Sequence, residues 1–263
     1  MQNLDFKIPL SQELSVASIP LECTYSGLRK LIPLQRGYFC VVDTMLNFYF
    51  YHYEYMSPPS LIIPPFGEKA NDYWFSFIIK YSTLFQIFLG REMNHNDYRT
   101  YFDTCNQNTD KVIVLYLGDN KLFIRLKEGL NGFIFDYQSP KFVPIEVPGS
   151  ESSEGIFLKY SETVILFTDN TGNVFLYNWM LRKLKRIKYE KDGKLLQLEK
   201  MINGNIVILT EAKDQSLVYS LQIIQPIKNK ILFIKQFADG IQEPKLFSSP
   251  YKDELIFTFA KWF

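Results

Sequence analysis

The sequence repeats a pattern of short apolar runs with a period of about 42 residues. Three series of runs occupy matching positions in consecutive units: Lys121–Leu126, Thr163–Thr168 and Asn205–Thr210; Gly132–Tyr137, Asn173–Asn178 and Leu217–Ile223; and Lys141–Val147, Leu184–Tyr189 and Ile231–Gln236. Because the runs are short and are separated by Gly, Asn and Asp, they predict strands joined by tight turns. A chain of such units must stack several small sheets, each of which buries its faces against the next.

Polarity changes in a regular order within each unit. Runs such as 164–167 and 206–209 are continuously apolar, which is typical of strands covered on both faces. The last run is more polar, and Lys141–Val147 contains Pro144, which cannot donate to a sheet ladder and belongs at an edge. Units of about 40–45 residues are typical of the blades of a β-propeller. We therefore predict an all-β fold, a propeller or partial propeller of antiparallel four-stranded blades.

The predicted propeller-like domain spans residues 1–263, either as a whole protein or as the N-terminal part of a longer one. Residues 11–64 read as one further unit. Lys245–Ser248 and Glu254–Phe259 begin another unit that the sequence does not finish. Two explanations stay open, since Leu4–Pro9 could supply a closing strand or the chain could be a fragment.

Residues 69–110 are less regular than the rest of the chain. Trp74–Ile79 and Leu84–Leu89 fit either two strands or one buried helix, because short apolar runs cannot be distinguished by their period alone. The polar stretch Arg91–Asp110 that follows is interpreted as a long loop. We expect this segment to be a helical or irregular excursion from the sheets.

One unit carries a family resemblance. Residues 168–178 read Thr-Asp-Asn-Thr-Gly-Asn-Val-Phe-Leu-Tyr-Asn, a short Asp/Gly turn followed by an apolar strand that ends on an aromatic and a polar residue. This segment resembles the second hairpin of a WD40 repeat, with Tyr177 and Asn178 where that family commonly has Trp-Asp. No unit has Trp-Asp or an initial Gly-His pair, so the structural hydrogen-bond network of the family is not carried over. The resemblance implies a degenerate WD40-like propeller, although propellers of other families fit almost as well.

The bulk composition favours an intracellular globular protein, in the nucleus or the cytoplasm. The net charge is +1, so no global field attracts nucleic acid or an anionic membrane. The three cysteines, Cys23, Cys40 and Cys105, form no disulfide framework or metal-binding pair, and buried structural thiols are the expected reading. The first ten residues lack the apolar segment of a signal peptide, and no stretch is apolar enough to span a membrane.

Catalytic motifs are absent from the sequence, and we predict no catalytic, cofactor-binding or metal-binding residues. His52 and Glu54 would share one face of a strand, but no third metal ligand is identifiable. His95 lies in a polar segment that reads as a solvated loop. A propeller hydrolase or glycan-acting enzyme would need convergent carboxylates. The residues near strand ends that could supply them are Asp43, Asp119, Asp169 and Glu211.

The densest cationic segment is the candidate interaction patch. It comprises Arg182, Lys183, Lys185, Arg186, Lys188 and Lys191, within a basic region over residues 182–194. As an outer strand it could bind a protein partner or the phosphates of nucleic acid, or simply be a solvated edge that prevents sheet-to-sheet aggregation. We predict a non-enzymatic interaction scaffold, a subunit of a larger complex with other protein subunits as partners. A nucleic-acid-associated subunit and the propeller enzyme are the alternatives, and no small-molecule ligand is identified.

Overall fold

The repeated runs form three four-stranded antiparallel sheets, each with its strands in chain order. Their strands are β6 (Val112–Gly118), β7 (Lys121–Leu126), β8 (Asn131–Asp136) and β9 (Lys141–Glu146); β10 (Phe157–Lys159), β11 (Val164–Thr168), β12 (Val174–Asn178) and β13 (Lys183–Ile187); and β14 (Gly193–Lys200), β15 (Ile206–Ala212), β16 (Tyr219–Gln225) and β17 (Lys230–Phe237). Consecutive hairpins in this order are the arrangement of a propeller blade, so the all-β prediction is confirmed.

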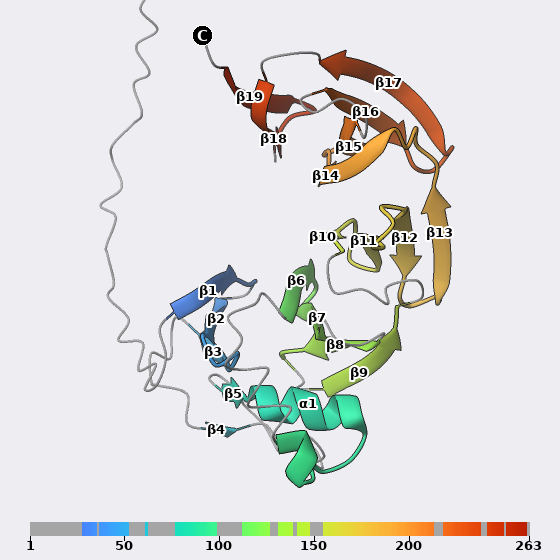
Figure 1. Ribbon diagram of the computed structural model, residues 1–263. Helices are drawn as coiled ribbons and strands as arrows, with labels where there is room; N and C mark the ends of the chain where they lie inside the picture. Colours follow the sequence, from blue (N-terminus) through green and yellow to red (C-terminus); the bar gives the residue numbers. More distant parts are fainter. Residues whose placement is uncertain are drawn as a thin grey trace, which may run out of the picture.

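The computed structural model describes residues 28–35, 37–52, 61–62, 77–98, 112–126, 131–138, 141–147, 155–212, 218–237, 241–249 and 251–261. Figure 1 shows the sheets following one another along an arc, with the first strand of each blade on the inner side and the last on the outer side. Leu4–Pro9, which could supply a closing strand, lies outside the described residues.

The first sheet differs from the repeated blades. Its strand order is β1 (Leu28–Pro33), β2 (Tyr38–Asp43), β3 (Phe48–His52), β5 (Phe77–Ile79) and β4 (Leu61–Ile62). β5 pairs antiparallel with β3, so the fourth strand comes from beyond the predicted unit at 11–64. β4 pairs with β5 in parallel at the edge, where a two-residue strand between proline-rich sequences needs few ladder bonds.

The irregular segment contains both a strand and a helix. β5 begins the described part, and the helix α1 (Tyr81–Leu89) follows it after one residue. The helix ends at Gly90, whose φ of 68° is left-handed and whose N–H donates to Ile87 O at 3.2 Å. Leu84 is fully buried against the first two sheets, which anchors the helix to the core. Neither alternative weighed from the sequence, two strands or one helix over both runs, is therefore realised as such, because the first run forms a strand and the second a helix.

The last described sheet has two strands, β18 (Ile241–Ser248) and β19 (Leu255–Lys261). They match the unfinished unit predicted at 245–259. Leu246 in β18 is fully buried and packs with β14 and β15, whereas Phe247 and Ile256 are exposed. Only one side of this sheet is therefore covered by the rest of the described chain.

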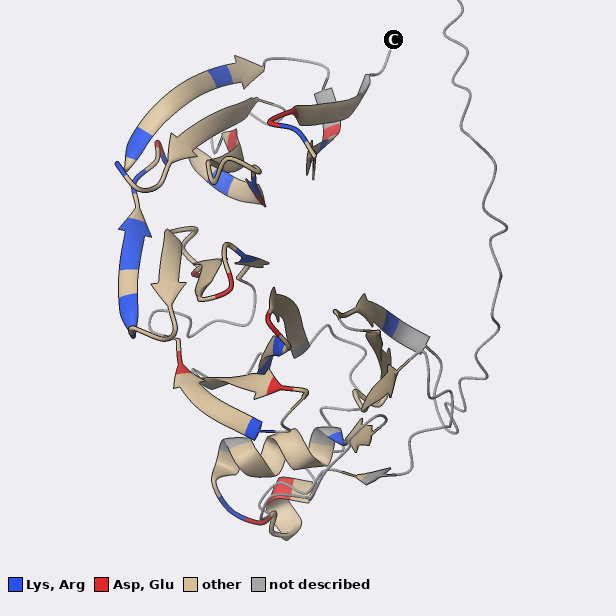
Figure 2. Cartoon of the chain, turned by 180° about the vertical axis from the view of Figure 1, so that it is seen from behind, with Lys and Arg blue, Asp and Glu red and all other residues tan. Residues whose placement is uncertain are grey.

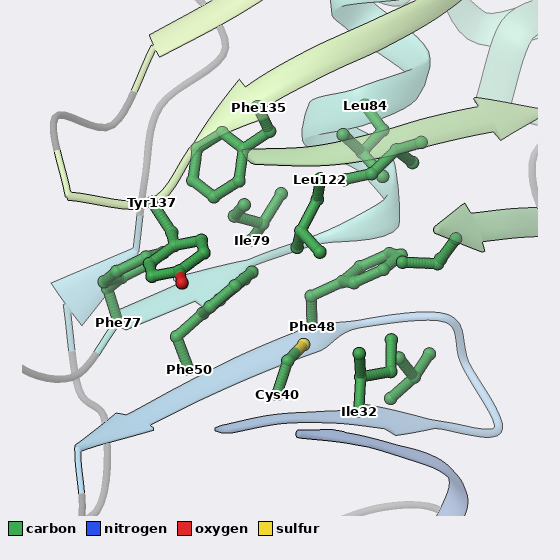
Figure 3. Close-up of a cluster of buried hydrophobic side chains, with 13 residues drawn as sticks. Ile32, Cys40, Phe48, Phe50, Phe77, Ile79, Leu84, Leu122, Phe135 and Tyr137 are labelled. Carbon is green, nitrogen blue, oxygen red and sulfur yellow. The ribbon is translucent and has the colours of Figure 1, made fainter. Parts of the chain in front are cut away.

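Apolar layers fill the space between consecutive sheets. The layer between the first two sheets is rich in aromatic rings, and Figure 3 shows Phe50, Phe77, Phe135 and Tyr137 pointing toward one another. Three further layers join the second sheet to the third, the third to the fourth, and the fourth to β18 and β19. Each of the three repeated sheets thus buries both faces against its neighbours, as the repeat predicts.

Two glutamine side chains tie neighbouring sheets together by pairing with a backbone residue. Gln222 in β16 is fully buried; its Nε2 donates to Glu190 O at 2.6 Å and its Oε1 accepts from Glu190 N at 2.9 Å. Gln197 in β14 pairs in the same way with both backbone groups of Leu246 in β18. Gln222 thereby joins the connection that precedes β14 to the sheet of β14–β17, and Gln197 joins β18 to the same sheet. They provide sheet-to-sheet hydrogen bonds in a chain that lacks the Trp-Asp and Gly-His residues of the WD40 pattern.

Candidate functional site

The candidate interaction patch lies along β13 and on the connection that follows it. All six predicted residues are exposed. Arg182 occupies the turn before β13 with a φ of 52°, three further cations lie in the strand, and Lys188 and Lys191 lie beyond it. Figure 2 shows this concentration of Lys and Arg along an outer strand, and β13 is the last strand of its sheet. The prediction of an exposed, cationic outer edge agrees with this placement.

The middle of the patch is joined to the next blade. Lys185 Nζ donates to Ile227 O at 2.9 Å, in the turn between β16 and β17. Lys188 N donates to Asn229 Oδ1 at 2.8 Å in the same turn. The outer face of β13 therefore continues directly onto the start of β17.

The far end of the patch borders a hollow of about 380 Å³, which we call the β13 hollow. Its lining residues are Asn173, Arg186, Ile187, Lys188, Tyr189 and Lys191. The structure thus brings together three of the six predicted residues, Arg186, Lys188 and Lys191. Arg182, Lys183 and Lys185 lie outside the hollow. Within the described ranges, no carboxylate forms an ion pair with the three cations of the hollow.

Arg186 is held by a hydrogen-bonded hairpin. Its Nη2 donates to Asn173 Oδ1 at 2.6 Å. Asn173 in turn donates from its backbone N to Asp169 Oδ1 at 2.8 Å and from Nδ2 to Asp169 Oδ2 at 2.7 Å. Thr171 also donates to Asp169 Oδ1, from both its backbone N and its hydroxyl. The carboxylate therefore orders the hairpin between β11 and β12, and the hairpin positions the guanidinium.

Tyr189 forms a fixed wall of the hollow. Its hydroxyl donates to Gly172 O at 2.5 Å. Burial raises the pKa of Tyr189 to about 12; the nearby Asp169 charge adds to this effect and Arg186 opposes it. The hydroxyl therefore remains protonated at neutral pH and continues to donate to the hairpin.

Replacing Asp169 with alanine should destabilise the protein by about 2 kcal/mol at pH 7, because a charged hydrogen-bond acceptor is removed. Burial alone would raise the pKa of Asp169, but the hydrogen bonds from Asn173 and Thr171 outweigh it and the pKa is lowered. The stabilisation is then complete above the unfolded-state pKa of about 3.9 and is lost as the pH falls through the lower folded-state value. Urea unfolding at a series of pH values measures this difference.

Asn170→Ala, in the same turn, is the matched control for that measurement. Asn170 is exposed, and its substitution should change the free energy of unfolding by less than about 0.5 kcal/mol. A constant difference between Asp169→Ala and the wild type from pH 7 to pH 2 would contradict the assigned role of the carboxylate.

The four carboxylates considered for catalysis occupy separate structural roles. Asp43 and Asp169 each accept hydrogen bonds from the asparagine four residues later, at the end of a second strand. Asp119 follows a first strand, which runs the opposite way, and forms an ion pair with Lys121 at 2.7 Å. Glu211 lies within β15, opposite Tyr219 and Lys194 in register. Asp119 thus lies at the opposite end of its blade from the strand ends that carry the other three.

The histidines and cysteines show no assembled site in the described part of the chain. His52 packs edge-on against Tyr38, with ring centroids 4.7 Å apart, and His95 is exposed. Glu54, Cys23 and Cys105 lie outside the described residues. Cys40 is fully buried, and burial raises the pKa of its thiol, as expected for a structural cysteine. No described group of three His, Cys, Asp or Glu residues could hold a metal ion, and no described helix is long and apolar enough to cross a membrane.

Sequence reasoning identified the cations of the hollow but missed Asn173 and Tyr189. A signal for Asn173 exists in the sequence, because an Asp-x-x-x-Asn pattern occurs at both 43–47 and 169–173. In both hairpins the asparagine N donates to the aspartate Oδ1 and its Nδ2 donates to Oδ2. Tyr189 carries no such signal, since only the folded hairpin brings Gly172 to its hydroxyl.

No protein-family model matches the chain, and no curated protein matches its sequence. Solved structures of similar arrangement include the tricorn protease (11% identity, 83% of this chain and 18% of that chain, TM-score 0.47), the β-propeller domain of Cps50 (Swd1) from Myceliophteria thermophila (9%, 84% and 58%, TM-score 0.45) and the WD40 domain of SCAP from fission yeast (11%, 85% and 56%, TM-score 0.41). The chain spans between 18% and 58% of the length of these three chains. The fold rests on the chain's own sheets, whose consecutive antiparallel hairpins are arranged as the blades of a β-propeller.

Proposed function

We propose that the protein is a non-enzymatic scaffold that binds an acidic, partly apolar segment of a partner protein along its outer strands β13 and β17. The observation that carries the proposal is the mixture of exposed cations and exposed apolar side chains on these two adjoining strands. The proposal assigns the protein no reaction of its own. It places the chain inside the cell, as a subunit of a larger complex.

Exposed apolar residues on β17 support a protein partner. Leu232, Phe233 and Ile234, which are consecutive in the outer strand β17, are 47%, 45% and 38% exposed. Leu184 in β13 and Ile227 in the turn before β17 are exposed as well. Because successive side chains of a strand point to opposite faces, both faces of β17 expose apolar groups to water, which is unfavourable and favours an interaction site.

Cations on the same strands indicate that the partner segment is negatively charged. Lys183, Lys185 and Arg186 are exposed on β13, and Lys230 and Lys235 are exposed on β17. An extended segment with acidic and apolar side chains could match both features. It could also pair with the edge of an outer strand, a common mode of peptide recognition. Nucleic acid would satisfy the cations and could stack a base on Phe233, but it offers little to Leu232 and Ile234.

Replacing Phe233 with aspartate should reduce partner binding at least about tenfold, because burial of a phenylalanine contributes about 1.5–3 kcal/mol. A charge reversal, Lys185→Glu, should weaken binding further and make it less sensitive to salt. The measurement is affinity purification of the tagged protein at native expression, with quantitative mass spectrometry at low and high salt.

Ile256→Asp and Lys252→Glu are the matched controls, since both residues are exposed and belong to β19 or the turn before it, not to β13 or β17. They should retain the partner. Purification of the wild type without any stoichiometric protein would overturn the proposal. Recovery of a nuclease-sensitive complex would support the nucleic-acid alternative instead.

A further inference from the structure

We propose that the β13 hollow binds the phosphate monoester of a phosphorylated serine or threonine in a partner segment. This inference rests on the proposed function in one respect, namely that the ligand is part of a protein. It adds a specific site and a chemical requirement to the general interaction surface. The partner would then bind β13 in a manner controlled by its own phosphorylation.

The charges of the hollow match a phosphate. Arg186, Lys188 and Lys191 all line it, and no described carboxylate forms an ion pair with them. Glu190 and Asp192 flank Lys191 in the sequence but do not line the hollow. The oxygens of Asp169, in the hairpin that holds Arg186, already accept four hydrogen bonds from Thr171 and Asn173. A phosphate monoester carries a charge of about −1.5 to −2 at neutral pH and offers three acceptor oxygens. Three cations around one cavity suit this ligand better than a single carboxylate.

Arg186 is oriented before any ligand arrives. Of its five N–H donors, one on Nη2 is used in the 2.6 Å bond to Asn173 Oδ1. The asparagine side chain cannot rotate away without losing the hydrogen bonds that its Nδ2 donates to Asp169 Oδ2 and Thr171 Oγ1. The guanidinium fork is therefore held at the edge of the hollow with donors remaining for an oxyanion. A positioned fork loses less conformational entropy on binding and favours the planar, paired geometry that phosphate accepts.

The hollow also has the dimensions and position for a side chain presented by an extended segment. Its volume of about 380 Å³ lies in the lower part of the range of ligand pockets. It lies at the end of β13, so a segment that pairs with this edge strand can direct one residue into it. Tyr189 contributes its ring to the wall, while its hydroxyl is already committed to Gly172. The phosphate contacts must therefore come from the cations.

The arrangement favours a phosphate on a protein over a nucleic-acid backbone. Single-stranded nucleic acid is bound by a cationic groove that tracks several phosphates, with aromatic rings for base stacking. Here the three cations line a single hollow, and the ammonium of Lys185 is bonded to the carbonyl of Ile227. The adjoining surface on β17 exposes the aliphatic Leu232 and Ile234 and only one aromatic ring, that of Phe233. One phosphate beside apolar contacts is the chemistry of a phosphorylated peptide.

The test uses the full chain and two fluorescent peptide libraries, one with a fixed central phosphoserine and one with serine at the same place. Free O-phosphoserine and a 12-nucleotide single-stranded RNA serve as competitors. Fluorescence anisotropy should show binding of the phosphorylated library at least tenfold tighter than the unphosphorylated one. Arg186→Gln and Lys191→Gln should each remove most of that difference. Asn173→Ala, which leaves the charge unchanged, should reduce it several-fold by releasing the guanidinium.

Lys183→Gln is the matched control, because Lys183 lies on the same strand but outside the hollow. It should leave the phosphate preference intact. Lys191 is exposed in the connection after β13, so its variant also tests the site if Arg186→Gln fails to fold. Equal binding of both libraries, or an unchanged preference in Lys191→Gln, would overturn the inference. If free O-phosphoserine binds as tightly as the phosphorylated library, the ligand is a small phosphate ester. If the RNA displaces the library at lower concentration than O-phosphoserine does, the ligand is nucleic acid. Either result rejects a phosphorylated segment.

Failure of this inference is distinguishable from failure of the proposed function. If Phe233→Asp loses the cellular partner while Lys191→Gln retains it, the scaffold surface holds and the phosphate site falls. If phosphoserine peptides bind the hollow but no stoichiometric protein is purified with the chain, the phosphate site holds and the scaffold proposal falls.

Discussion

Gly193→Ala will destabilise the protein by at least about 3 kcal/mol, a shift of roughly 6–12 °C in the melting temperature of a domain of this size. Gly193 begins β14 and pairs with Ala212 in β15. A Cβ at this position would lie 1.7 Å from Glu211 O, which is a backbone atom of the neighbouring strand. No rotamer change relieves such a contact, so the two strands would have to separate. Differential scanning calorimetry measures the effect.

Gly90→Ala separates this steric effect from the general effect of removing a glycine. Gly90 has a φ of 68°, but no atom lies within 4 Å of the position of its Cβ. The variant should lose only about 1–2 kcal/mol, from the left-handed backbone. If Gly193→Ala unfolds no more easily than Gly90→Ala, β14 and β15 do not approach as closely as the structure places them.

The same close approach recurs in the preceding blade and shows what the sequence conceals. A Cβ on Gly155, just before β10, would lie 2.2 Å from Thr168 O at the end of β11. Sequence analysis offers no reason to regard this residue as structural, because it follows a run of Ser and Glu at 150–154 that resembles a linker. A glycine near the start of the first strand, opposite the end of the second, is thus a repeated feature of two blades. The sequence alone does not show which residue of the second strand lies opposite each glycine, because that depends on the strand pairing.

The strands that sequence reasoning predicts best are those with apolar neighbours on both faces. β11 and β15 are buried along most of their length, and both coincide with continuous apolar runs. The first strands β10 and β14 gave no comparable signal. β10 has only three residues, and β14 mixes Lys194, Gln197 and Glu199 with leucines. Since Gln197 is needed to bind the backbone of Leu246, the polarity that obscures β14 in the sequence is part of how the sheets are joined.

For the candidate site, composition located the charges but not their geometry. The exposed cations of β13 follow from the polarity of an outer strand. Arg186 lines the hollow because it contacts a residue 13 positions away, and Lys185 is joined to the next blade because it contacts a residue 42 positions away. Such distant pairs leave no periodic trace in a single sequence.

Phe50→Ala will lower the stability of the protein by about 3–5 kcal/mol and will loosen the first sheet from the second. Phe50 in β3 is fully buried, stacks on Phe77 at 4.5 Å between ring centroids, and packs against Phe135 at 5.5 Å. Figure 3 shows its ring between the strands of the two sheets. Loss of this ring leaves a cavity at the junction where the irregular first sheet, with its parallel edge strand, meets the regular blades. Calorimetry and limited proteolysis together measure the loss of stability and the site of opening.

Two substitutions bracket the expected result. Phe50→Leu fills most of the cavity and should cost clearly less than Phe50→Ala, while Phe233→Ala removes the same atoms from an exposed position and should change stability by less than about 0.5 kcal/mol. In Phe50→Ala, proteolysis should begin in the first sheet, because its attachment to the repeated blades depends on this aromatic layer. A Phe50→Ala protein that melts like the wild type, or that is first cleaved within β10–β17, would show that the first sheet is held by contacts other than the ones described for Phe50.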